Sequence, residues 1–264
     1  MANKQLYING VEVLTTQSSI SGRNLTDDES AKFDAAWKSI KAYYNYNGKV
    51  DLFTEDMKEV TKKVLGSELV KRPGNQNFGG MTPDGGLGIR PISMADICGN
   101  LVTQVPLNTW DVDWQNVGWR LWLGNHAANT ALGLNNATDV LGAHLEIVQR
   151  DATNQIEWAT LFWGVLDMNP SPKISALRCS MGKEVVGDHD IELPMRNTEA
   201  RYADLGRAYY FSCPDAFSVG VYIRALIAGG IGVSALRPIG VTIAPANRLK
   251  QLAANVPLGC ASSG

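Results

Sequence analysis

The chain has 264 residues, 45% of them hydrophobic, and 24 Lys plus Arg against 26 Asp plus Glu give a formal net charge of −2. This length and composition exclude a wholly disordered chain and allow a large core in one or two domains. The balanced charge, with no block of like charges, excludes binding of nucleic acid or anionic lipid through bulk electrostatics.

The start of the chain predicts a β-hairpin. Asn9-Gly10 supplies the two positive-φ residues of a type I′ turn, and β-prone residues flank it at 6–8 and 11–13. An isolated two-stranded hairpin is marginally stable in water. We therefore expect this hairpin to dock, either on its own body or on a neighbour.

Two helices are expected next. Thr26 and Glu29 have the spacing of a capping box, and the apolar residues that follow fall on one stripe of a helix over 27–45. A second helix is expected over 55–66, with acidic residues at its start and Gly66 as a plausible C-cap. Residues 1–72 thus form a hairpin arm and a charged helical subregion.

Residues 73–94 are rich in glycine and proline, a composition that resists both helix and strand. We therefore expect an irregular connector here. So long a stretch without secondary structure is uncommon inside a compact domain, and such a stretch is either mobile or held by another surface.

Beyond the connector the pattern predicts a mainly β fold. The body, over 95–246, is expected to be an antiparallel β-sandwich of the jelly-roll type, because short strands recur between Gly and Pro breaks. The expected strands are 117–123, 143–150, 155–166, 174–179, 184–193, 208–213, 218–228 and 240–243. Residues 247–264 are expected to form a short helix and a tail.

Two motifs have the composition of a ligand site but not its context. Gly230-Ile-Gly232 with Ala235 matches a dinucleotide fingerprint, yet Pro238 would break the helix that this fingerprint requires. Asp188-His189-Asp190 resembles a metal or acid–base site, but alternating strand side chains would point apart, so we expect a polar hairpin tip. We expect no cofactor and no metal, and the four cysteines, widely spaced, are expected as free thiols.

A weak catalytic alternative involves Glu146 and Glu157. These carboxylates would be diagonal neighbours on an expected hairpin, within the range that glycosidases use. Most of the tryptophans lie in the same region, and aromatic rings beside paired acids suit a sugar. A carbohydrate-binding or glycoside-cleaving module is therefore one alternative function, and an accessory or adaptor domain of a larger machine is another. Otherwise we expect no enzyme, because neither a nucleophile elbow nor a catalytic cysteine context is present.

Charge is distributed unevenly along the chain. Of the 50 (24 + 26) charged residues, 21 lie in the first 72 positions and 29 in the remaining 192, about 15% of that part. Globular domains carry about a quarter charged residues, so the β-body has few charges for an ordinary wet surface. We infer that neighbouring subunits cover much of it.

Three strand segments carry a resemblance to a known family. Tyr209-Tyr-Phe-Ser-Cys213, Phe217 to Ile227 and Ile239 to Ile243 resemble the closing strands of jelly-roll virus coat proteins, over about residues 95–245. The resemblance implies a self-assembling shell protein, located in a virion or an intracellular assembly, with copies of itself and other structural proteins as partners. Many such proteins have a basic N-terminal arm, which this chain lacks, so a tube, a filament or a shell filled by other means is expected.

For such an assembly, the expected contacts lie on the hairpin arm, the connector and the start of the body. They are Leu6, Tyr7, Ile8, Val11, Val13, Phe78, Trp110 and Trp114. Neither a signal peptide nor a transmembrane segment is expected, because the start lacks an apolar core and no apolar run is long enough to span a bilayer.

Overall fold

The computed structural model describes most of the N-terminal region and the strands of the body. The described residues are 3–45, 50–71, 78–79, 86–92, 118–121, 159–167, 174–181, 184–199, 201–212, 217–223 and 236–246. Within them the protein is mainly β, with two sheets and three helices. The predicted strand 143–150 and the predicted helix after residue 246 lie outside these residues.

The larger sheet has six strands in the order β1-β2-β8-β5-β10-β3. Its strands are β1 (Lys4–Ile8), β2 (Val11–Thr15), β3 (Leu87–Pro91), β5 (Ala159–Asp167), β8 (Tyr202–Ser212) and β10 (Leu236–Pro245). All of its neighbouring pairs are antiparallel except β2 and β8, which run parallel. The two ends of this sheet are β1 and β3.

The smaller sheet has four antiparallel strands in the order β4-β9-β6-β7. These are β4 (Gly118–Leu121), β6 (Ile174–Met181), β7 (Glu184–Asp190) and β9 (Phe217–Ile223). The helices are α1 (Asp27–Tyr44), α2 (Glu55–Lys71) and the short α6 (Glu192–Asn197).

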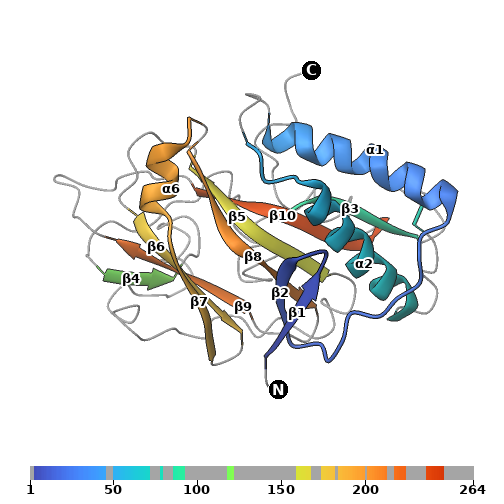
Figure 1. Cartoon of the computed structure of the whole chain (residues 1–264), viewed down its shortest axis with the longest axis horizontal. Helices are drawn as coiled ribbons and strands as arrows, with labels where there is room; N and C mark the ends of the chain where they lie inside the picture. The colour runs from blue at the N-terminus through green and yellow to red at the C-terminus, as the bar shows by residue number, and fades with distance from the viewer. Residues whose placement is uncertain are drawn as a thin grey trace, which may run out of the picture.

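The described elements form three layers, with the six-stranded sheet in the middle (Figure 1). On one side Trp37 of α1 stacks on Trp163 of β5, with ring centroids 6.3 Å apart. On the other side Phe217 of β9 stacks on Phe211 of β8 at 4.2 Å. The two α-helices of the N-terminal region therefore cover one face of the large sheet, and the small sheet covers the other.

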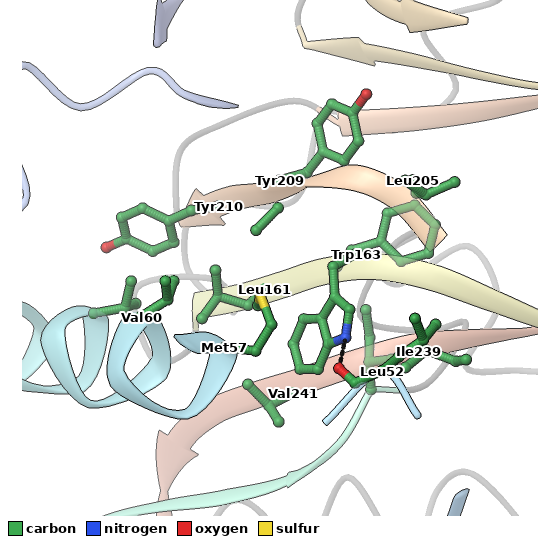
Figure 2. Packing of buried hydrophobic residues seen from close by; sticks show 14 of the residues in the cluster. Leu52, Met57, Val60, Leu161, Trp163, Leu205, Tyr209, Tyr210, Ile239 and Val241 are labelled. Carbon is green, nitrogen blue, oxygen red and sulfur yellow. Dashed lines mark hydrogen bonds between the residues drawn. The ribbon is translucent and has the colours of Figure 1, made fainter. Parts of the chain in front are cut away.

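The core is continuous across these layers. Tyr209 and Tyr210, adjacent on β8, point to opposite sides of the strand and are both buried (Figure 2). Trp163 is also buried, and its indole Nε1 donates to the Leu52 carbonyl oxygen at 2.9 Å. Burying a large apolar side chain contributes about 1.5–3 kcal/mol, so the loop before α2 is fixed by the sheet that it covers.

This layering accounts for the low charge of the central strands. All residues of β5 from Ala159 to Leu166 are buried, as are those of β10 from Pro238 onward. A strand covered on both faces has no solvent side on which charged residues are favoured. For these strands the covering is supplied by the chain's own helices and second sheet, which corrects the inference that neighbouring subunits are needed to cover them.

The N-terminal hairpin forms as predicted. Asn9 and Gly10 have φ of 48° and 79°, and Ile8 pairs with Val11 across them. Of the two docking sites considered, the chain uses its own body, because β2 pairs with β8 through Val13 and Ala208.

The first helix is confirmed with both halves of its capping box. The Thr26 side chain accepts from the Glu29 amide, and the Glu29 carboxylate accepts from the Thr26 amide. The predicted apolar stripe is buried, at Phe33, Trp37, Ile40 and Tyr44.

The second helix runs five residues past Gly66, which is therefore not its C-cap. A Cβ at Gly66 would lie 2.2 Å from the Arg23 carbonyl oxygen, and a Cβ at Gly22 would lie 2.1 Å from the Ser67 nitrogen. Glycine is present here because two backbones touch. The helix continues because its buried stripe extends to Leu69.

Several strand boundaries differ from the predictions, among them those of β10, which begins four residues before and ends two residues after the predicted 240–243. Three other differences have a direct structural cause. The predicted strand 184–193 ends at Asp190, where the Asp190 carboxylate accepts from the Glu192 amide and α6 begins. Part of the predicted connector forms β3, because Leu87 and its neighbours pair with the end of β10. β8 begins six residues earlier than predicted, since an irregularity around Gly206, with φ of 70°, divides it.

Candidate functional site

Three titratable side chains meet between the two sheets. Cys179 of β6, His189 of β7 and Tyr209 of β8 form what we call the intersheet cluster. The Tyr209 hydroxyl lies 2.5 Å from His189 Nε2, and the two rings meet edge to face at 5.8 Å. The buried Cys179 thiol is close enough to this hydroxyl for each group to affect the pKa of the other. Through its contact with His189, Tyr209 ties the large sheet to β7 of the small one.

Gly187 makes room for this arrangement. A Cβ on Gly187 would lie 2.1 Å from the Tyr209 hydroxyl and 2.8 Å from His189 Nε2. No side chain larger than hydrogen fits between β7 and the phenol at this point.

Burial sets the protonation of the intersheet cluster. It raises the pKa of the Cys179 thiol and of the Tyr209 hydroxyl well above their usual ranges. Burial, assisted by the nearby Arg207 cation, lowers the pKa of His189 to about 4. At neutral pH all three groups are therefore uncharged.

These directions are the wrong ones for nucleophilic catalysis. A reactive cysteine needs a lowered thiol pKa and access for substrate, whereas Cys179 is fully buried and its pKa is raised. The cluster has the properties of a buried, hydrogen-bonded connection between sheets.

The Asp188-His189-Asp190 motif is divided among separate partners. Asp188 receives two hydrogen bonds of 2.7 Å from Arg178 on the neighbouring strand, while the Asp190 carboxylate accepts from the Glu192 amide at the start of α6. The predicted hairpin tip is wrong, because these residues lie within β7 and pair in register with β6. Alternation along the strand sends Asp188 and His189 to opposite faces, as expected. Among the described residues no group of three metal-ligating side chains occurs.

A second buried network joins α2 to β8 and was not predicted. The Tyr210 hydroxyl donates to the Glu68 carboxylate, and Lys71 Nζ lies 3.1 Å from the same hydroxyl and 3.5 Å from Glu68. Lys71 also donates to Gln17, just past β2, at 3.1 Å. The signal in the sequence is Glu68 itself, a charged residue that falls on the apolar stripe of α2.

Glu29 is a buried carboxylate that accepts four hydrogen bonds. It forms two hydrogen bonds of 2.6 and 2.7 Å with Arg23, and accepts from the amides of Thr26 at 2.9 Å and Phe78 at 3.0 Å. The Arg23 guanidinium and these amides lower the pKa of Glu29 to about 2. Glu29 thus anchors Phe78, which lies in the predicted connector 73–94, to the start of α1.

The predicted assembly residues fall into two groups. Tyr7 is 67% exposed, and Leu6, Ile8 and Val11 are half-buried, so these side chains reach the surface. Val13 and Phe78 are 0% and 1% exposed. These two side chains are used in the chain's own core and do not face a neighbour in this fold.

The remaining predicted site residues lie outside the described part of the chain. They are Trp110, Trp114, Glu146 and Glu157. The paired-carboxylate alternative therefore stays a prediction from the sequence.

The strand edges differ in how well they are covered. At β3, Phe78 forms a bridge with Leu87, and the Gly79 amide donates to the Leu87 carbonyl at 3.4 Å. At β1, Lys4, Gln5 and Tyr7 are exposed, and among the described strands only β2 pairs with it. Among the described residues, the six-stranded sheet thus has a covered edge at β3 and an open edge at β1.

Comparison with known proteins finds no match to this chain among protein-family models, curated proteins or solved structures. Within the described residues, no helix has the length and apolar character needed to cross a membrane.

Proposed function

We propose that this chain is a self-assembling structural subunit of the coat type, which forms a shell, tube or filament from copies of itself. The observation that carries the proposal is the edge at β1, where Tyr7 is 67% exposed and β2 is the only described strand that pairs with it, in a sheet whose strand β5 is buried from Ala159 to Leu166. An open strand edge is a template for pairing with another chain, and exposed tyrosine is typical of protein interfaces.

The body behind this edge suits a building block. The hairpin is fastened to β8 by strand pairing and by the ion pair between Arg207 and Glu12 at 3.3 Å. The same side of the molecule carries β7, whose Glu184 accepts from Asn3 at 2.6 Å. An edge held this firmly loses little conformational entropy when it binds.

The uneven charge distribution supports this proposal less strongly once the structure is considered than it did when only the sequence was considered. The charge-poor central strands are covered by the chain itself, so their composition gives no information about neighbours. Support comes instead from the open edge and from the protonation states of the intersheet cluster, which are those of a structural connection.

The coat-type part of the proposal draws on the resemblance of residues 95–245 to jelly-roll coat proteins. Two of the resembling segments contribute to β8 and β10 of the large sheet, and the third contains β9 of the small sheet. Jelly-roll connectivity is part of this proposal. Packaging of nucleic acid through charge is not, because Lys4 is the sole basic residue before Arg23.

The test is the mass of the purified chain. Size-exclusion chromatography with light scattering, followed by negative-stain microscopy, is expected to show a homogeneous species much heavier than the 28.6 kDa chain. A monomer that persists at tens of micromolar would refute the proposal.

A further inference from the structure

We infer that two copies of this chain join through β1, antiparallel and about a two-fold axis at Leu6, so that their six-stranded sheets become continuous. The inference rests on the proposed self-assembly and names one of its contacts. It is carried by three features of β1: which backbone groups face outward, how its sequence pairs with itself, and its charge.

The hairpin determines which backbone groups are free. A two-residue turn is flanked by a hydrogen-bonded pair, here Ile8 and Val11, and bonded pairs alternate along an antiparallel ladder. Leu6 and Lys4 therefore direct their amides and carbonyls toward β2. Gln5 and Tyr7 direct theirs toward the open edge.

In only one two-fold register does Gln5 of each copy pair with Tyr7 of the other. With the axis at Leu6, Gln5 of each copy lies opposite Tyr7 of the other, and the two pairs exchange four backbone hydrogen bonds. With the axis at Gln5 or at Tyr7, one of these residues pairs with itself and the other faces an end of the strand. The Leu6 register therefore gives the longest paired segment.

The side chains agree with this register. Gln5 Nε2 already donates to the Tyr7 hydroxyl at 2.7 Å within one strand, so the same two groups are complementary across the axis. Leu6 meets its own copy on the opposite face. Lys4 lies opposite Ile8, and the two Lys4 residues are four positions apart, about 13 Å along the strands, beyond the distance at which exposed charges repel strongly.

The edge at β7 is a poorer match to its own copy. It carries three carboxylates, Glu184, Asp188 and Asp190, and like charges opposite each other are destabilising. β1 has a single charge, so the second copy is assigned to β1.

Cysteine substitution reports the register directly. Leu6 and its copy form a non-hydrogen-bonded pair, whose closely spaced Cβ atoms allow a disulfide. Under mild oxidation we expect L6C to form a covalent dimer at least tenfold faster than I8C. Ile8 is the matched control, since it is apolar, half-buried and on the same face but about 13 Å from its copy. Wild type under the same oxidation accounts for the native thiols.

A proline substitution tests the backbone contact. Tyr7→Pro removes an outward amide and leaves the pairing with β2, because proline is tolerated at strand edges. We expect it to raise the dissociation constant of this contact at least tenfold, with the circular dichroism of the fold unchanged.

The outcomes separate this inference from the proposed function. An assembled chain in which L6C and I8C crosslink equally, or in which neither crosslinks and Tyr7→Pro has no effect, overturns the β1 pairing and leaves self-assembly standing. A crosslink between a cysteine on β1 of one copy and a cysteine on β7 of another copy would likewise overturn the pairing of β1 with itself. A stable wild-type monomer overturns both.

Discussion

Replacing Glu29 by glutamine removes one buried charge and keeps the shape of the side chain. The Glu29 side chain is 6% exposed, and its partner Arg23 is 33% exposed. Its carboxylate serves the helix cap and the Phe78 amide at the same time. Each carboxylate oxygen accepts from one Arg23 nitrogen and one backbone amide. The NH₂ of glutamine therefore faces two donors, Arg23 together with either Thr26 or Phe78, and two hydrogen bonds are lost.

The magnitude follows from the lowered pKa. A change from 4.5 to about 2 is about 2.5 units, and at 1.36 kcal/mol per unit the ionised form stabilises the fold by about 3 kcal/mol at neutral pH. Measured losses on breaking buried pairs, 3–5 kcal/mol, are of similar size. Because Arg23 is partly exposed, we expect E29Q to lower the free energy of unfolding by about 2–3 kcal/mol.

The sign of the pH dependence is fixed by the direction of the shift. The folded pKa lies below the unfolded one, so this stabilisation is complete above pH 4.5 and is lost as the pH falls toward 2. The measurement is urea unfolding of wild type and E29Q at fixed protein concentration at pH 7, pH 4 and pH 2.5. The control is D28N, which removes an exposed carboxylate from the same turn and is expected to change stability by less than about 0.5 kcal/mol. A loss below 0.5 kcal/mol for E29Q at pH 7, or a difference from wild type that does not shrink in acid, would show the reasoning to be wrong.

Three further predictions concern stability. Because the pKa of His189 is lowered to about 4, the fold is expected to lose stability as the pH falls from 6.5 toward 4. The loss is about 1–2 kcal/mol after allowance for solvent screening. In H189Q the melting temperature should change less between pH 6.5 and 4.5 than it does in wild type. G187A is expected to destabilise the fold by about 2 kcal/mol, because its Cβ meets the Tyr209 hydroxyl. In denaturant unfolding, G187A combined with Y209F should lose clearly less stability than the sum of the two single variants. Additive losses would contradict the contact between residue 187 and the Tyr209 hydroxyl. G66A, which in an ordinary helix stabilises by about 1 kcal/mol, is expected to destabilise here because its Cβ meets the Arg23 carbonyl, and a raised melting temperature would contradict this.

Local signals predicted the N-terminal elements well. The Asn9-Gly10 turn and the capping box of Thr26 and Glu29 act over four residues or fewer, and both form as expected. The end of α2 was missed because Gly66 has the composition of a helix cap, and only the approach of Arg23 from another segment shows its actual role.

Long-range pairing left no comparable signal. The contact of His189 with Tyr209 joins two sheets, and the parallel pairing of β2 with β8 joins distant parts of the chain. Low charge was recognised, but composition alone does not distinguish a strand covered by its own chain from one covered by a neighbour. The open edge at β1 was therefore only half predicted. Tyr7 and Leu6 were named from the hairpin in the sequence, but only the structure shows that Phe78 covers the opposite edge at β3.

The parallel pairing of β2 with β8 has a consequence during synthesis. Gln17, at the end of the hairpin, contacts Ser212, 195 positions later. At about 5–20 residues per second, a ribosome needs about 10–40 s to make the intervening chain, whereas a hairpin closes in about 1–10 μs. The hairpin can thus close long before β8 exists, but it is only marginally stable until it docks. During that interval both of its edges are open to nascent chains on the same message.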